Sequence, residues 1–327
     1  MHRSVALLFT VTVALAAGMG QTSAQDVKNY PQKPVRFIVP FAPGGGVDIV
    51  ARAVAGRLGE ILGQQVIVDN RGGGGTIIGT ELGARAAPDG YTLLFGSTTL
   101  AINPSLRTKL PYDTLKDLVP VTQASFQAYV LAVHPSVPAK NVKEFIALAK
   151  AKPDTLTYGS PGIGSGSHLV AEFFALSTGV KTVHVPYKGS SPAMADLIGG
   201  QIQFTYGTIL AVYPQVRNGK IRPLAVSSAK RTSVMPEVPT IAEAGVPRFD
   251  ATSWNGVLVP AGTPRPIIDK VHAGVVKALQ SPEVKDRLVG DGAEPVGSTP
   301  EQFAAFIRVE IAKWGKVIKA AGIKAES

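Results

Sequence analysis

The stretch VRFIVPFAPGGGVDIVARAVAGRLGEIL, residues 35–62, combines the features that decide the fold. Val35–Phe41 is a continuous apolar run, which is typical of a strand covered on both faces of a parallel sheet. Three glycines follow at Gly44–Gly46, and apolar residues then recur at helical spacing from Val50 to Ile61. The stretch therefore predicts one strand–loop–helix unit of an α/β protein.

The same alternation continues along the chain, which predicts a mainly parallel, doubly wound α/β architecture. Further strands are expected at residues 65–70, 91–96, 128–134, 156–159, 182–187, 202–208, 221–228 and 252–260. Further helices are expected at residues 76–87, 141–151, 167–177, 191–200, 266–279, 282–290 and 300–321.

The first 24 residues have the features of a cleavable secretory signal. His2 and Arg3 are followed by the apolar run VALLFTVTVALAA and by the small-residue exit Thr22–Ala24. We expect cleavage after Ala24 and export to the periplasm. The rest of the 327-residue chain is longer than one hydrophobic core usually organises, so two lobes are expected.

The chain crosses between the lobes twice in this prediction, near Val121–Phe126 and Phe249–Trp254. Residues 25–122 and 252–327 would form the first lobe, and residues 123–251 the second. The chain contains no cysteine, which excludes disulfides and thiol catalysis. The net charge of +10 is spread along the whole sequence, so it indicates a basic surface rather than a nucleic-acid site.

Four loops between a strand and a helix are rich in glycine and hydroxyl-bearing residues. They are Phe41–Val47, Gly96–Asn103, Gly159–His168 and Tyr187–Ser191. In α/β sheets, ligands bind beyond the carboxyl ends of the strands, where helix N-termini attract anions. Glycine lets the backbone approach an anion closely, and serine adds hydrogen-bond donors. Together the loops predict an anion-binding cleft.

Other site chemistries fit the sequence less well. Neither G-x-G-x-x-G nor G-x-x-x-x-G-K-[ST] occurs, which argues against a nucleotide cofactor. The loop with Ser160, Ser165, Ser167 and His168 leaves an exported serine hydrolase as the alternative, although no serine lies in G-x-S-x-G. The histidines show no H-E-x-x-H motif, so no metal site and no cofactor are predicted.

Nine motifs in this order resemble the extracytoplasmic solute receptors of tripartite tricarboxylate transporters, the Bug receptor family. The motifs are YPQKPVRFIVPFAPGGGVDIVAR, VDNRGGGGTIIG, APDGYTLLFG, INPSLRTKLPYDTLKDLVPVT, YGSPGIGSGSHL, VPYKGSSPAMADLIGGQIQF, NGKIRPLAVSS, PEVPTIAEAGVP and SWNGVLVPAGTP. The resemblance covers nearly the whole mature chain. It implies a type II-like periplasmic binding protein with two α/β lobes, a hinge and a ligand cleft between the lobes.

The resemblance also implies the site residues. In the first lobe these belong to the segments Phe41–Gly46 and Ser97–Thr98, with Phe41, Ala42, Gly45 and Gly46 in the first of them. In the second lobe they are Ser160, Gly164, Ser165, Gly166, Ser167, His168, Tyr206, Gly207 and Thr208. The loop around Ser165 would hold a ligand carboxylate through N–H and hydroxyl groups.

One position departs from the family pattern. Relatives that accept amino acids often carry an aspartate where this chain has Gly207, and a buried ammonium group without a counter-charge is unfavourable. We therefore expect a dicarboxylate without an amine. Tyr206, with Phe41 and Phe126, would suit an aromatic acid such as terephthalate.

The resemblance finally implies a binding protein rather than an enzyme. It would deliver a small organic acid to the integral-membrane permease subunits of a tripartite tricarboxylate transporter. Apart from the resemblance, we expect the protein to be a monomer. It would need no cofactor and bind no nucleic acid.

Overall fold

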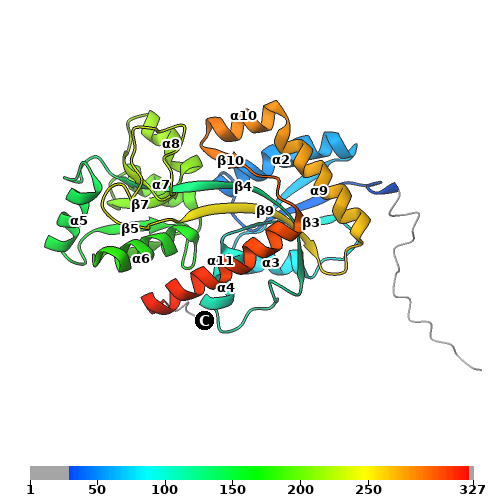
Figure 1. The fold of residues 1–327 in the computed structure, drawn as a ribbon, viewed down its shortest axis with the longest axis horizontal. Coiled ribbons are helices and arrows are strands. Elements are labelled where there is room, and N and C mark those ends of the chain that lie inside the picture. The colour runs from blue at the N-terminus through cyan, green and yellow to red at the C-terminus, as the bar shows by residue number, and fades with distance from the viewer. Residues whose placement is uncertain (1–28, 324–327) are drawn as a thin grey trace, which may run out of the picture.

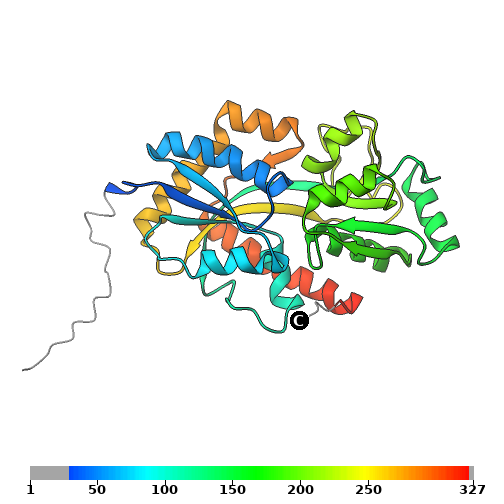
Figure 2. The same cartoon turned by 180° about the vertical axis from the view of Figure 1, so that it is seen from behind.

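The computed structural model describes residues 29–323, so the predicted signal peptide at residues 1–24 lies outside the described residues. Two α/β lobes lie side by side, and two long strands run through the middle of the molecule and join them (Figures 1 and 2). In the part of the chain that the structure describes, no helix is both long and apolar enough to cross a membrane.

The first lobe is built from strands β1, β2 and β3 and the helices around them (Figure 1). Its elements are β1 (Val35–Val39), α2 (Gly46–Leu62), β2 (Val66–Asn70), η1 (Gly74–Thr76), α3 (Ile77–Ala84), β3 (Thr92–Ser97), α4 (Thr99–Leu106), α9 (Arg265–Gln280), α10 (Pro282–Gly290) and β10 (Ala293–Pro295).

The second lobe is built from strands β5 to β8 and four helices (Figure 1). Its elements are α5 (Val142–Ala151), β5 (Thr157–Ser160), α6 (Gly166–Thr178), β6 (Val183–Pro186), α7 (Ser190–Ile198), β7 (Phe204–Thr208), α8 (Ile209–Arg217) and β8 (Arg222–Val226). Strands β4 (Leu118–Val133) and β9 (Thr252–Pro260) join the lobes, and helix α11 (Pro300–Ala321) lies beside both strands.

The strands form one sheet in the order β2-β1-β3-β9-β4-β7-β5-β6, and β8 and β10 also pair with β4. Pairing is parallel among β1, β2 and β3 and among β5, β6 and β7, as the strand–loop–helix alternation predicts. The joining strands add antiparallel pairs, because β9 returns alongside β4 and contacts β3 on its other edge. The two-lobed α/β fold is confirmed, with a mixed sheet at its centre.

Strand β4 changes its partners where it passes from one lobe to the other. Residues Leu118–Ala128 pair with β9, and Tyr129–Val133 pair with β7. The ladder with β9 shifts register at Pro120/Thr122 and again at Gln123/Ser125. The lobe limits at residues 123 and 251 stay a prediction, because both lobes share this strand.

Burial of apolar side chains explains why residues 35–62 form a strand–loop–helix unit. Phe37, Ile38 and Val39 of β1 are fully buried between helices, as expected for a strand covered on both faces. Val50 and Leu58 of α2 are also buried against the same core. The glycines between strand and helix therefore lie at the carboxyl edge of the sheet, where the two lobes meet.

Helix α11 packs against the strands β4 and β9 that join the lobes. Trp254 of β9 is fully buried and meets the ring of Phe303 at 5.5 Å, edge to face. Glu310 Oε2 accepts hydrogen bonds from the indole nitrogens of Trp254 at 3.1 Å and Trp314 at 3.0 Å. Because α11 also packs against α4 and α6, it contacts both lobes.

Candidate ligand-binding site

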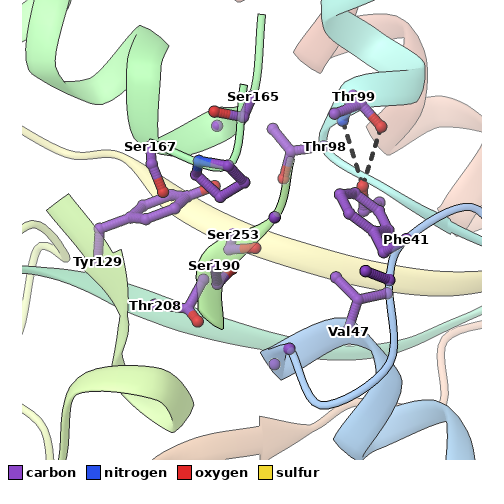
Figure 3. Close-up of a pocket in the computed structure, with 17 residues that line it drawn as sticks. Phe41, Val47, Thr98, Thr99, Tyr129, Ser165, Ser167, Ser190, Thr208 and Ser253 are labelled. Atoms are coloured by element: carbon purple, nitrogen blue, oxygen red, sulfur yellow. Dashed lines mark hydrogen bonds between the residues drawn. The ribbon is translucent and has the colours of Figure 1, made fainter. Parts of the chain in front are cut away.

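A pocket opens between the lobes, above the strands that join them (Figure 3). Its walls enclose about 580 Å³, a volume that includes space open to solvent. Its lining residues are Phe41, Ala42, Gly45, Gly46, Val47, Ser97, Thr98, Thr99, Tyr129, Pro161, Ser165, Gly166, Ser167, Gly189, Ser190, Thr208 and Ser253. Among the described residues, none that lines this pocket carries a formal charge.

Five helices begin at the wall of this pocket. Their N-cap residues are Gly45 for α2, Thr98 for α4, Ser165 for α6, Gly189 for α7 and Thr208 for α8, and all five line the pocket. The first N–H groups of a helix have no partner within it, and the helix dipole makes this end partly positive. The convergence gives the pocket a positive potential built from neutral groups.

The first loop, residues 41–46, is held in place by a buried carboxylate outside the pocket. Asp48 accepts hydrogen bonds from Gly44 N at 2.9 Å, Arg52 Nε at 2.9 Å and Asn70 Nδ2 at 2.9 Å. Burial alone would raise the pKa of Asp48, but these hydrogen bonds and the charge of Arg52 lower it overall. Asn70 Nδ2 also donates to Phe41 O at 3.1 Å, so the carboxylate positions the loop and faces away from any ligand.

Hydroxyl groups at the end of β3 form a hydrogen-bonded chain. Thr76 Oγ1 donates to Thr99 Oγ1 at 2.9 Å, and Thr99 Oγ1 and Ser97 Oγ share a hydrogen bond of 3.0 Å in which either can be the donor (Figure 3). Ser97 Oγ also accepts from the backbone N–H of Thr99 at 3.4 Å. When Thr99 supplies the proton of the shared bond, the Ser97 hydroxyl can donate to a group in the pocket.

Tyr129 lies at the pocket wall, on strand β4, which joins the lobes. Burial raises the pKa of its hydroxyl to about 12, although the neighbouring side chains of Ser253 and Thr98 act to lower it. The phenol consequently stays protonated and can donate. A Cβ atom added to Gly166 would lie 1.8 Å from the Tyr129 hydroxyl, so glycine is required where α6 approaches this ring.

The structure divides the predicted loop Gly159–His168 into two groups. Ser165, Gly166 and Ser167 line the pocket, and Ser165 Oγ also accepts from His168 N at 3.3 Å as the cap of α6. Ser160, Gly164 and His168, which the sequence predicts as ligand contacts, do not line it.

The residues behind the loop support it. His168 stacks on His184 with ring centroids 4.1 Å apart, and its Nδ1 accepts from Gly164 N at 3.1 Å. Burial, helped by the neighbouring imidazole, lowers the pKa of His168 to about 3, and burial lowers that of His184 to about 4. Both rings are therefore neutral near pH 7 and hold the loop through packing and hydrogen bonds.

Of the three predicted residues on β7, only Thr208 lines the pocket. The Tyr206 ring is fully buried, 5.7 Å from Phe174, so it cannot flank a ligand ring as expected. A Cβ atom at Gly207 would lie 2.6 Å from Val212 Cγ2, within the packing of α7 and α8. The geometry thus corrects the expectation that an acidic side chain at position 207 would face the ligand.

Seven lining residues are missing from the predicted site. Five of them belong to loops that the sequence marks as anion-binding: Val47, Thr99, Pro161, Gly189 and Ser190. Tyr129 and Ser253 lie within strands, where no loop signal exists. Their only sequence signal is a polar group in an otherwise apolar run.

The arrangement of Ser160 argues against the serine hydrolase alternative. Ser160 Oγ lies 2.7 Å from His184 Nε2, but it donates to Gly162 O at 3.0 Å and accepts from Gly162 N at 3.1 Å. Gly162 O therefore competes with the imidazole for the one serine proton, and while the carbonyl holds it the imidazole can only donate to the serine. Ser160 also does not line the pocket. Across residues 29–323, the structure contains no cluster of acidic, histidine or cysteine side chains that could hold a metal ion.

Comparisons with known proteins agree with this geometry. A family model described as "Tripartite tricarboxylate transporter family receptor" matches residues 50–323. BugT of Bordetella pertussis is 40% identical over 319 residues, which cover 97% of this chain and 96% of BugT. A structure of an R. palustris protein with adipate matches with a TM-score of 0.87 and 38% identity, covering 90% of this chain and 99% of that chain.

MatC from Rhodopseudomonas palustris, solved with bound malate, matches with a TM-score of 0.82 and 33% identity. The match covers 88% of this chain and 100% of MatC. Sequence and fold thus agree over nearly the whole described chain, and the chain belongs to the TctC family, the Bug-type solute-binding receptors of tripartite tricarboxylate transporters.

Proposed function

We propose that this protein is a periplasmic receptor for a small dicarboxylate that carries no amine. It would capture the acid between its lobes and deliver it to the permease subunits of a tripartite tricarboxylate-type transporter. The observation that carries this proposal is the convergence of five helix N-termini on one pocket without charged walls. Carboxylates are bound at such termini without lysine or arginine.

The second lobe would bind one carboxylate through the first turn of α6. Ser165 and Ser167 supply hydroxyl groups there, and Gly166 leaves the backbone N–H groups accessible. The other end of the acid would meet the start of α2 and the Ser97 hydroxyl in the first lobe. A ligand that contacts both lobes binds the closed form more tightly, and this difference drives closure.

The composition of the walls supports an acid without an amine. Among the described lining residues there is no aspartate or glutamate, so an ammonium group would be desolvated without a counter-charge. Phe41 and Tyr129, rather than Tyr206 and Phe126, are the aromatic rings that could contact a planar acid such as terephthalate. The relatives solved with adipate and with malate each hold a dicarboxylate that carries no amine.

We also propose that the protein is exported with cleavage after Ala24, acts as a monomer and is not an enzyme. The protein would hold the acid without any covalent step. Ser160, which contacts His184, can give its hydroxyl proton to Gly162 O, and this contact supports binding without catalysis.

Calorimetric titration of the mature protein tests the proposal. The panel comprises adipate, malate, terephthalate, citrate and aspartate, and mass spectrometry checks that the bound acid is recovered unchanged. We expect saturable binding of at least one amine-free dicarboxylate and no turnover. Tight binding of aspartate alone, or hydrolysis of an ester or amide by the purified protein, would overturn it.

A further inference from the structure

Several buried polar atoms beneath the pocket have no hydrogen-bond partner. Gln127 of β4 is only 1% exposed, and neither its Nε2 nor its Oε1 is bonded. Thr208 Oγ1 and Asn255 Oδ1 are also buried and unbonded. A buried polar group without a partner is unfavourable, so such groups in native proteins usually meet an ordered water or a ligand.

Thr208 lines the pocket, and Gln127 and Asn255 lie next to it without lining it. A Cβ atom added to Gly46 would lie 2.8 Å from Thr208 Oγ1 and 3.8 Å from Gln127 Nε2. Gln127 also pairs in register with Ser253 of β9, which lines the pocket, so their side chains lie on one face of the sheet. Asn255 is two residues further along β9 and therefore on that same face. We call Gln127, Thr208 and Asn255 the polar floor.

The polar floor lies where the lobes meet. Gly46 begins α2 in the first lobe, Thr208 ends β7 in the second, and Gln127 is on the strand that passes through both. A group bound here would contact both halves of the protein. Its presence would therefore matter most in the closed form.

The chemistry of the floor differs from that of the helix N-termini above it. Gln127 presents a donor and an acceptor, Thr208 can act as either, and Asn255 presents an acceptor while its Nδ2 donates to Ser125 Oγ at 3.3 Å. A carboxylate cannot satisfy the two amide oxygens, because it only accepts. A hydroxyl group has one proton and two lone pairs, so it can donate to one amide oxygen and accept from Gln127 Nε2 or the Thr208 hydroxyl.

On the basis of the proposed function, we propose that the polar floor selects dicarboxylates that also carry a hydroxyl group, and that Gln127 determines this specificity. The carboxylates would bind at the helix N-termini, and the hydroxyl group would point to the Gln127 amide and the Thr208 hydroxyl. An acid without the hydroxyl would leave these atoms buried and unpaired.

The test compares acids that differ only by a hydroxyl group. The pairs are malate with succinate, 3-hydroxyadipate with adipate, and citrate with tricarballylate, each titrated calorimetrically into the wild type and Gln127→Met. Methionine keeps the length of the side chain and removes its hydrogen bonds. For a pair that binds, the wild type should prefer the hydroxy acid about tenfold, the equivalent of one net hydrogen bond.

In Gln127→Met this preference should disappear, while the acid without the hydroxyl keeps its Kd within about threefold, because it never bonded to the amide. The Tm without ligand should not fall, since replacing an unpaired buried amide by an apolar group of similar shape is neutral or stabilising. Gln280→Met makes the same change on the exposed end of α9 and should leave the preference intact.

The outcomes separate the two proposals. If the wild type binds both members of a pair equally, a water molecule fills the floor and the specificity proposal is wrong, although the receptor proposal stands. If Gln127→Met loses stability and weakens both acids equally, the residue is structural and the proposal is likewise wrong. If no organic acid binds to the wild type, the receptor proposal itself fails.

Discussion

Replacing Gly46 by alanine should hinder closure of the lobes and so weaken ligand binding. Gly46 is the first residue of α2, and an added Cβ atom would lie 2.8 Å from Thr208 Oγ1 and 3.5 Å from Leu210 Cβ, both in the second lobe. Such overpacking costs about 1–3 kcal/mol, which corresponds to ligand binding roughly 5-fold to 150-fold weaker. Because the clash forms only when the lobes meet, it opposes closure and not the folding of either lobe.

Calorimetric titration with the acid that the wild type binds best measures this effect. Gly56→Ala is the matched control, because Gly56 lies in the same helix and its added Cβ atom would meet nothing within 4 Å. It should leave the Kd unchanged and slightly raise the Tm, since alanine favours a helix by up to about 1 kcal/mol over glycine. Thr208→Ala removes Oγ1, the atom that the added Cβ atom would approach too closely.

The double variant Gly46→Ala/Thr208→Ala should therefore bind about as well as Thr208→Ala alone. The prediction fails if Gly46→Ala binds the acid like the wild type, or if its loss of affinity stays the same size after Thr208 is truncated. Either result would mean that the approach of α2 to Thr208 has no part in ligand capture.

Three further predictions address the loops and the core. Ser165→Ala and Ser167→Ala should each weaken binding by about 1–3 kcal/mol by calorimetry, whereas Ser177→Ala at the exposed end of α6 should not. Because the pKa of His168 is lowered to about 3 and that of His184 to about 4, both lie below the value of about 6.5 in an unfolded chain. The free energy of unfolding should be constant above that value and fall as the pH drops from about 6.5 toward 4, since the unfolded chain then binds more protons. Thermal melts should show a smaller fall for His184→Gln, and a Tm independent of pH would contradict the assignment. Glu310→Ala should lower the free energy of unfolding in urea by about 1–3 kcal/mol for each indole N–H left without an acceptor, and Glu310→Gln should lose less.

The regular elements of the fold could be predicted from local patterns. Strand β9 has the bounds expected from its sequence, Thr252–Pro260, and the last three helices lie within one or two residues of the predicted ranges. Helices α4 and α8 were not predicted, because Pro104 and Pro214 lie inside them and usually indicate a helix end. The first half of β4 was also missed, since its polar residues are satisfied by neighbouring strands distant in sequence.

The site could be predicted at the level of loops but only in part at the level of residues. Glycine and hydroxyl content indicates where helices begin, and four of the five N-caps at the pocket lie in the loops marked for that reason. Whether Ser160 or Ser165 faces the pocket depends on the packing of α6 against β5 and β6, which no local pattern encodes. Tyr129 and Ser253 enter the pocket because β4 and β9 cross beneath it, a consequence of long-range pairing.

Because the described pocket walls carry no formal charge, different forces govern the association and the dissociation of an acid. The basic surface of the protein, with a net charge of +10 over the full sequence, attracts anions over a distance, and dissolved salt screens this attraction. Hydrogen bonds from helix N-termini act at contact, where little screening occurs. Rising ionic strength should therefore lower the association rate constant and leave the dissociation rate constant nearly unchanged. The lifetime of the complex should then be about the same at low and at high salt concentration.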